Sequence, residues 1–86
     1  MMVQVRVMDR NGLHARPASK VVSIALAHPG TVYLEKNGVR YDAKKIMEVM
    51  GLNLIYGEKI KVIAFGEGSD QVEESIGKII MTPEQN

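Results

Sequence analysis

The chain has 86 residues, a formal net charge of +1 and no cysteine, which fits one domain spanning residues 1–86. A chain this small buries only about 60–65% of the surface that its unfolded form exposes, so function is expected at the surface and no cofactor in a deep cavity is expected. The balanced charge argues against nucleic acid as a partner, and the absence of cysteine excludes disulfides and thiolate metal sites. No apolar run is long enough to insert in a membrane. We therefore expect a cytoplasmic protein that holds no metal.

Taken in order, the chain first predicts a strand and a helix. Valines that alternate with other residues indicate a half-buried strand over residues 2–8. A helix is expected over residues 15–27, and His28 at its end is expected to interact with free carbonyl groups of its last turn. Apolar residues at helical spacing define the buried stripe of this helix: Ala18, Val21, Val22, Ala25 and Leu26.

A hairpin and a short helix follow. The runs 32–35 and 39–42 alternate cleanly, and Asn37-Gly38 between them is the strongest short-range signal for a hairpin. The stretch 45–52 is helical in its spacing and has a glycine near its end.

The last third of the chain predicts a strand and a helix. Residues 59–65 carry Ile60, Val62 and Ala64 on one face and Ile63 and Phe65 on the other, which indicates a central strand or partial cover of the second face. Ser69 or Asp70 is expected to cap a final helix, and residues 82–86 are expected to fray because they have no apolar anchor. The buried stripe of this helix is predicted to comprise Val72, Ile76, Ile79 and Ile80.

The element order is therefore βαββαβα, which places the chain in the α+β class. Each helix offers one apolar stripe, and the first three strands have one apolar face. We expect an open-faced β-sandwich, in which three helices cover one face of a four-stranded antiparallel sheet.

His14 is the candidate functional residue, because it lies where the first helix begins. Pro17 suits a first helical turn, since its missing N–H would have no intrahelical acceptor there. The unpaired N–H groups of Ala15 and Arg16 and the helix dipole disfavour a protonated imidazole, and the Arg16 cation acts in the same direction. A neutral imidazole can act as a nucleophile.

The same donors would hold a phosphoryl group. A phosphate dianion on His14 would meet the open backbone amides of Ala15 and Arg16, and the Arg16 guanidinium could add charge-assisted hydrogen bonds. From spacing alone the alternative stays open that His14 is only a capping or surface histidine.

Two blocks of this sequence resemble a known family. Residues 11–18 read Asn-Gly-Leu-His-Ala-Arg-Pro-Ala and resemble the active-site signature of HPr, the histidine-containing phosphocarrier of the bacterial phosphoenolpyruvate:sugar phosphotransferase system. Residues 45–52 read Lys-Ile-Met-Glu-Val-Met-Gly-Leu and look like the second signature of that family. The resemblance runs over nearly the whole chain and implies the same open-faced sandwich.

The middle helix has more apolar residues than one buried side can use. Val49 and Leu52 are assigned to the core, and Ile46, Met47 and Met50 are expected to form an exposed patch that contacts partners. The alternative is that all of them pack inside. The resemblance implies that this helix docks partners together with the histidine. Further residues assigned to this surface are Leu54 and a basic rim formed by Lys44 and Lys45 with Arg16 and Lys20.

One position departs from many members of that family. In HPr proteins of many Gram-positive bacteria a serine opens the second block and is phosphorylated by a regulatory kinase, whereas this chain has Lys45 there. The resemblance therefore implies that this regulatory serine is missing. For Lys44 the alternative is an ordinary solvated position at a helix start.

The resemblance implies a phosphocarrier, which is an intermediate in a phosphotransferase chain and not an independent catalyst. His14 would accept a phosphoryl group on Nδ1 from phosphorylated enzyme I and donate it to a sugar-specific enzyme IIA, and the carrier would be a monomer that forms transient complexes. A second hypothesis is a nitrogen-branch or regulatory HPr-like protein that binds partners according to its phosphorylation state. A third, a small nucleic-acid or metal-binding domain, lacks paired exposed aromatics and a cluster of ligands.

Overall fold

The computed structural model describes residues 2–84 and contains four strands and three helices in the order βαββαβα. The strands are β1 (Met2–Arg6), β2 (Val32–Lys36), β3 (Val39–Asp42) and β4 (Lys59–Ala64). The helices are α1 (Ala15–Ala27), α2 (Ile46–Gly51) and α3 (Ser69–Met81). The predicted fold class is confirmed.

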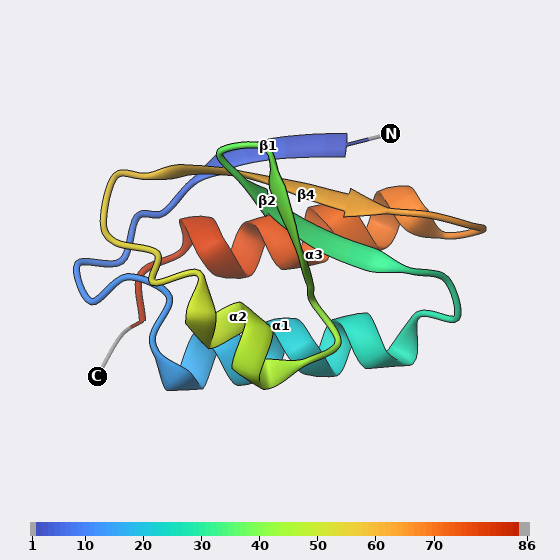
Figure 1. Ribbon diagram of the computed structural model, residues 1–86, viewed down its shortest axis with the longest axis horizontal. Coiled ribbons are helices and arrows are strands. Elements are labelled where there is room, and N and C mark those ends of the chain that lie inside the picture. The colour runs from blue at the N-terminus through green and yellow to red at the C-terminus, as the bar shows by residue number, and fades with distance from the viewer. Residues whose placement is uncertain (1, 85–86) are drawn as a thin grey trace.

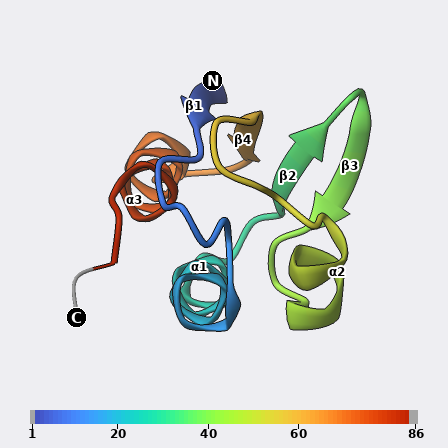
Figure 2. The ribbon, with the colours of Figure 1, turned by 90° about the vertical axis from the view of Figure 1, so that its left-hand side faces the viewer.

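The strands form one antiparallel sheet in the order β1-β4-β2-β3. β4 lies between β1 and β2, which confirms the prediction of a central strand. All three helices lie on one face of the sheet (Figures 1 and 2). The other face is open and carries polar residues such as Glu35 and Lys61, whose side chains form an ion pair at 3.6 Å.

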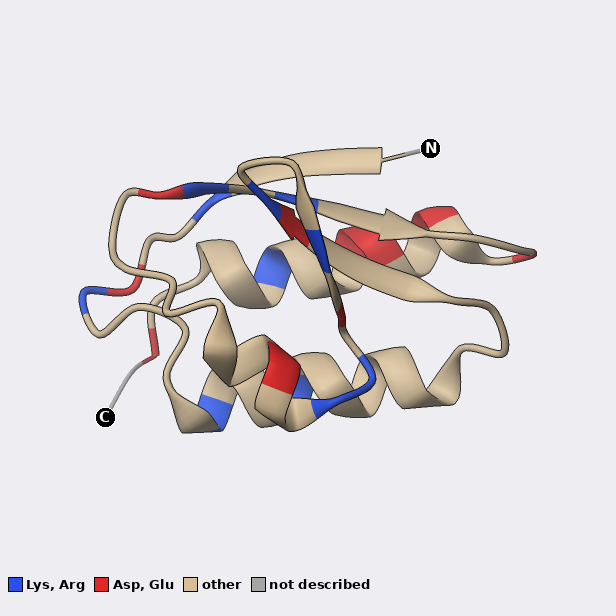
Figure 3. Ribbon diagram, in the orientation of Figure 1, with Lys and Arg blue, Asp and Glu red and all other residues tan. Residues whose placement is uncertain are grey.

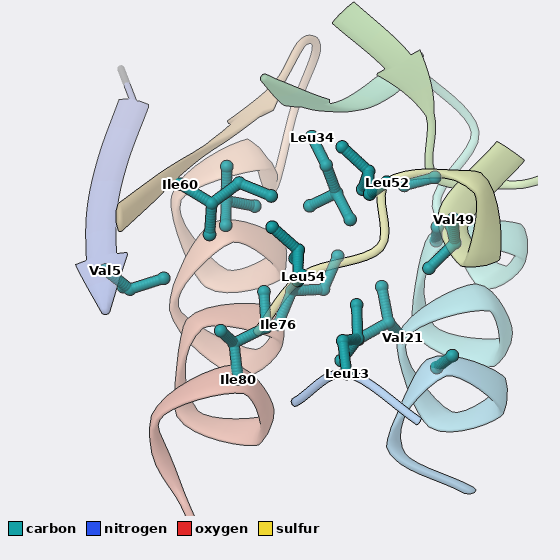
Figure 4. Close-up of a cluster of buried hydrophobic side chains, with 14 of the residues drawn as sticks. Val5, Leu13, Val21, Leu34, Val49, Leu52, Leu54, Ile60, Ile76 and Ile80 are labelled. Carbon is teal, nitrogen blue, oxygen red and sulfur yellow. The ribbon is translucent and has the colours of Figure 1, made fainter. Parts of the chain in front are cut away.

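The core lies between the sheet and the helices (Figure 4). Leu34 and Val62 of adjacent central strands are fully buried, and Ile76 of α3 packs in the same cluster. Gly77 lets α3 approach β1 closely, since a Cβ there would lie 3.2 Å from Val5 Cγ1. The helix propensity lost at this glycine, about 1 kcal/mol relative to alanine, is therefore exchanged for close packing.

Several sequence-based boundaries were wrong by a few residues. β1 ends at Arg6 and not at residue 8. Val7 still exchanges backbone hydrogen bonds with Glu58 and Gly57 just before β4, but the Met8 N–H leaves the sheet and donates to the Ile80 carbonyl oxygen of α3. α3 has Gly68 as its N-cap, at φ +83°, so neither Ser69 nor Asp70 caps it. Val39 is exposed although it is apolar, because β3 is an edge strand.

Two predicted roles in and after α1 also need correction. Leu26 is 61% exposed, and Ile24 packs against the core in its place. His28 donates its backbone N–H to Ala25 at the helix end as expected, but its ring is buried and Nε2 lies 2.6 Å from the Phe65 carbonyl oxygen. The ring therefore connects α1 to the end of β4 and does not cap α1.

Candidate functional site

His14 is the N-cap residue of α1. Its backbone is extended, with φ −78° and ψ −178°, and its carbonyl accepts the Ala18 N–H at 3.0 Å. The N–H groups of Ala15 and Arg16 precede the first intrahelical bond, and Pro17 has no N–H, so the first turn presents two open amide donors. The His14 side chain makes no capping bond to them and is 33% exposed, which leaves both the ring and the amides available to a ligand.

A tight loop before α1 fixes the position of His14. The Gly12 N–H donates to the Asp9 carbonyl at 2.9 Å, and Gly12 has φ +70°, which only glycine adopts without strain. A Cβ at Gly12 would overlap the Leu54 carbonyl oxygen. That oxygen also accepts the Leu13 N–H at 3.2 Å, and Leu13 inserts in the core (Figure 4). The loop is thus pinned on both sides of Gly12.

The ring of His14 has one buried and unsatisfied nitrogen. Nε2 is shielded from solvent and has no hydrogen-bond partner among residues 2–84. The Asp9 carboxylate faces it, with Oδ2 at 3.6 Å from Nε2, just beyond hydrogen-bond length. Backbone N–H groups of Glu84 and Asn11 donate to this carboxylate and hold the pKa of Asp9 below its usual range, so Asp9 is an anion at neutral pH.

The segment after α3 lies against the same site. The Glu84 N–H donates to Asp9 Oδ2 at 2.7 Å, and the Glu84 carboxylate lies 3.5 Å from Arg16 Nε and 3.4 Å from Lys20 Nζ. Figure 1 shows this segment beside the β1–α1 loop, and Figure 3 shows acidic and basic positions in that loop and an acidic position in the segment after α3. The prediction that residues 82–86 fray is therefore wrong for Glu84, while residues 85–86 lie outside the described part of the chain.

Two buried polar side-chain atoms in the described chain lack a hydrogen-bond partner, and both belong to this site: His14 Nε2 and Glu84 Oε1. Buried polar atoms are nearly always satisfied, so exceptions indicate strain or function. Their coincidence beside an open helix N-terminus marks the site independently of any sequence motif.

Sequence reasoning found His14 and Arg16 and missed both acidic residues. Asp9 could have been noticed as the first residue of an Asx turn, because its Oδ1 accepts the Asn11 N–H at 2.8 Å. Glu84 has no comparable signal, since its contacts join residues 64 to 75 positions apart.

A second candidate surface is formed by exposed apolar residues of α2 and of the loop after it. Val49 and Leu52 are buried and Met47 is 81% exposed, with Ile46 and Met50 partly exposed beside it, so the predicted division between core and surface of α2 is confirmed. Leu54 is 5% exposed and packs in the core, which corrects its assignment to this surface. Its exposed neighbours Ile55 and Tyr56 are the apolar residues that continue the surface, because Leu54 turns inward where its backbone holds the loop before α1.

The three lysines assigned to the basic rim have different surroundings. Lys20 pairs with Glu84. Lys44 donates from Nζ to the His28 carbonyl oxygen at 2.7 Å, which gives its side chain a structural contact at the end of α1. Lys45 is the N-cap residue of α2 and is well exposed, at 3.9 Å from Glu48. The structure thus brings Lys20 to the His14 site, while Lys44 lies at the opposite end of α1.

Comparison with known proteins assigns this chain to a protein family. The family model described as "PTS HPr component phosphorylation site" matches residues 2–82, nearly the whole chain. The chain belongs to the HPr family. The HPr-like protein Crh of Bacillus subtilis is 37% identical over 77 residues, covering 90% of this chain and 91% of its own length. The phosphocarrier protein HPr of Treponema pallidum is 37% identical over 68 residues, covering 79% of this chain and 75% of its own.

The HPr fold is equally clear from solved structures. The phosphocarrier protein HPr of Bacillus anthracis superimposes with a TM-score of 0.86 at 30% identity, covering 93% of this chain and 95% of that one. Within residues 2–84, this HPr-family chain contains no cluster of three or more histidine, cysteine or acidic residues that could hold a metal ion. Its described helices are too short or too polar to cross a bilayer.

Proposed function

We propose that this HPr-family protein is a phosphocarrier of the cytoplasmic sugar-uptake branch, which accepts a phosphoryl group on His14 from phospho-enzyme I and donates it to an enzyme IIA. The observation that carries the proposal is the arrangement around His14: a partly exposed ring at the start of α1, two open amides after it, and two cations nearby. Phosphoryl transfer depends mostly on positioning and charge stabilisation, which such an arrangement can supply.

The accepting atom is Nδ1 in this proposal. Nε2 is enclosed next to Asp9, so it has no access to a phosphoryl donor without a rotation of the ring. A dianion on Nδ1 would be stabilised by the amides of Ala15 and Arg16 at the N-terminus of α1. The Arg16 side chain is 68% exposed and tied to Glu84 through Nε at 3.5 Å, a distance at which surface pairs are weak, so it is free to turn to the phosphate.

The exposed surface of α2 and the following loop is proposed to dock both partners. Met47 and Ile55 offer apolar area that can adapt to more than one protein. The Leu13–Leu54 backbone bond joins this surface to the loop that holds His14, so a partner seated on it would be held beside the ring.

Mixing the purified protein with enzyme I, phosphoenolpyruvate and Mg²⁺ tests the proposal. We expect a mass gain of one phosphate that is lost in His14→Ala and transferred on addition of an enzyme IIA. A mass gain that persists undiminished in His14→Ala would refute the assignment. Met47→Asp should raise the concentration of protein needed for half-maximal phosphorylation and leave the unfolding midpoint unchanged.

A regulatory or nitrogen-branch role is the second candidate. Its regulatory part is supported by the similarity to Crh, which is described as a catabolite repression protein, although the Treponema pallidum HPr is equally similar at 37% identity. Competition between enzyme IIA proteins separates the two: faster dephosphorylation by a nitrogen-type partner would overturn the sugar branch. We also propose a monomer that forms transient complexes. Structures of Crh and of an HPr from Thermoanaerobacter tengcongensis are described as dimers, so sedimentation at micromolar concentration is the direct test.

A further inference from the structure

We propose that Asp9 is a positioning residue for His14: its carboxylate holds the imidazole as the Nε2–H tautomer, so that the Nδ1 lone pair faces outward. The expected effect of Asp9 on phosphorylation rests on the proposed phosphocarrier function. Its effect on the tautomer of the His14 ring concerns the unphosphorylated protein alone.

The Asp9 carboxylate is the one hydrogen-bond acceptor of the described residues that faces Nε2 of His14. Nε2 is enclosed and unsatisfied, and Asp9 Oδ2 lies 3.6 Å away. Hydrogen bonds of this kind are often long before the reaction and shorten when charge develops. An imidazole that donates from Nε2 to a carboxylate must keep its lone pair on Nδ1, since a neutral ring has one donor and one acceptor nitrogen.

The carboxylate itself is held from two sides. Oδ1 accepts the Asn11 N–H at 2.8 Å within the loop, and Oδ2 accepts the Glu84 N–H at 2.7 Å from the far end of the chain. Both donors keep Asp9 ionised and in place, and Asp9 is itself buried. The ring of His14 is thus oriented by a group whose own rotation is restricted.

The same carboxylate balances the charge of the transfer step. The Nδ1 lone pair forms the new N–P bond, and the electrons of the old N–P bond return to the phosphohistidine of the donor protein. The proton on Nε2 stays in place, so the His14 ring becomes positively charged as the bond forms. Asp9 faces that charge at Nε2, while the dianion on the other side meets Arg16, a division of roles like that of an aspartate behind a catalytic histidine.

The other charged groups at the site cannot replace Asp9. Arg16 and Lys20 are cations, and the Glu84 carboxylate is directed to them at 3.5 Å and 3.4 Å. Of the anions that contact this site within residues 2–84, Asp9 is the one paired with the His14 ring.

The variant Asp9→Asn tests the inference. Its oxygen should keep the Asn11 N–H, because that bond is part of a three-residue turn, whereas the bond to Glu84 can be given up by movement of the terminal segment. The new NH₂ would then face Nε2 and donate to it, which moves the ring proton to Nδ1 and blocks the accepting atom. We expect two-bond ¹⁵N–¹H spectra of labelled histidine to show Nε2–H in the parent and Nδ1–H in the variant, and phosphorylation about tenfold to hundredfold slower.

Two control variants separate this effect from general damage. Asp70→Asn removes the same charge from the first turn of α3, at the other end of that helix, and should leave tautomer and rate unchanged. Glu84→Pro removes the N–H that donates to Asp9 and should retain the Nε2–H tautomer. A shift of the tautomer in Glu84→Pro would assign the effect to the terminal segment and overturn the role of Asp9.

The outcomes also separate this inference from the proposed function. Retention of Nε2–H in Asp9→Asn, or an unchanged phosphorylation rate in that variant, overturns the positioning role. A parent protein that takes no phosphoryl group refutes the phosphocarrier function, and the histidine spectra of the same samples still decide what Asp9 does.

Discussion

Replacement of Gly12 by alanine should destabilise the protein more than the same replacement at Gly38. Both glycines have positive φ, +70° and +81°, so both variants lose about 1–2 kcal/mol to left-handed backbone strain. A Cβ at Gly38 meets nothing within 4 Å, whereas one at Gly12 overlaps the Leu54 carbonyl oxygen. Gly38→Ala is therefore a matched control for the conformational cost alone.

The additional cost at Gly12 follows from the contact that must open. Moving the Leu54 carbonyl away breaks its bond to the Leu13 N–H, at 3.2 Å, in a region where Leu13 is buried. Leaving such buried groups unsatisfied costs about 1–3 kcal/mol. We expect Gly12→Ala to lower the free energy of unfolding by about 2–5 kcal/mol and Gly38→Ala by about 1–2 kcal/mol.

Urea unfolding at neutral pH measures both values. For a domain of this size each kcal/mol also lowers the thermal midpoint by about 4–8 °C. Phosphorylation of His14 should slow in Gly12→Ala and stay unchanged in Gly38→Ala at a temperature where both are folded. Equal destabilisation by the two variants would refute the argument that the Leu54 carbonyl pins the loop.

Three further predictions concern other parts of the molecule. Leu54→Ala should lower the free energy of unfolding by about 2–5 kcal/mol because its side chain is in the core. The neighbouring Ile55 is 65% exposed, so Ile55→Ala should change the free energy of unfolding by less than about 0.5 kcal/mol. Similar losses in urea titrations of the two variants would contradict the observed burial. Met47→Asp should weaken binding of enzyme I in calorimetry with a thermal midpoint like that of the parent, and unaltered affinity would remove α2 from the docking surface. Backbone N–H donors hold the pKa of Asp9 and the pKa of Glu58 below their usual ranges. Both carboxylates therefore contribute stability that is complete near neutral pH and is lost as the pH falls below about 4. Thermal midpoints measured from pH 6 to pH 2 should fall less steeply in Asp9→Asn and in Glu58→Gln than in the parent, and slopes equal to that of the parent would contradict the lowered pKa values.

The elements of this fold were predictable because they depend on local patterns. Alternation defined the first three strands, and Asn37-Gly38 defined the hairpin. The helix-breaking residues Pro29 and Gly30 lie just after the observed end of α1 at Ala27. Errors arose where packing overrode spacing. The 3.6-residue repeat allowed Leu26 or Ile24 to complete the buried stripe, and the position of α1 relative to its neighbours selected Ile24.

The site was predictable only where it is local in sequence. His14, Arg16 and Pro17 lie within four residues, and helix physics alone assigns the amides and the cation to one place. Asp9 is near His14 in sequence, but no spacing indicates that its carboxylate faces the ring. Glu84 is brought to Asp9 and Arg16 by the closure of the whole fold, and no period in the sequence encodes a contact between residues 9 and 84. The acidic half of the site is therefore a finding of the structure.

The central claim is that His14 carries a phosphoryl group on Nδ1 while Nε2 stays enclosed beside Asp9. The most direct measurement is a ¹⁵N and ³¹P spectrum of histidine-labelled protein after reaction with enzyme I and phosphoenolpyruvate. We expect one phosphorylated ring, that of His14, with phosphorus coupled to Nδ1 and the proton on Nε2. Phosphorus coupled to Nε2 of His14, or found on His28, would contradict it.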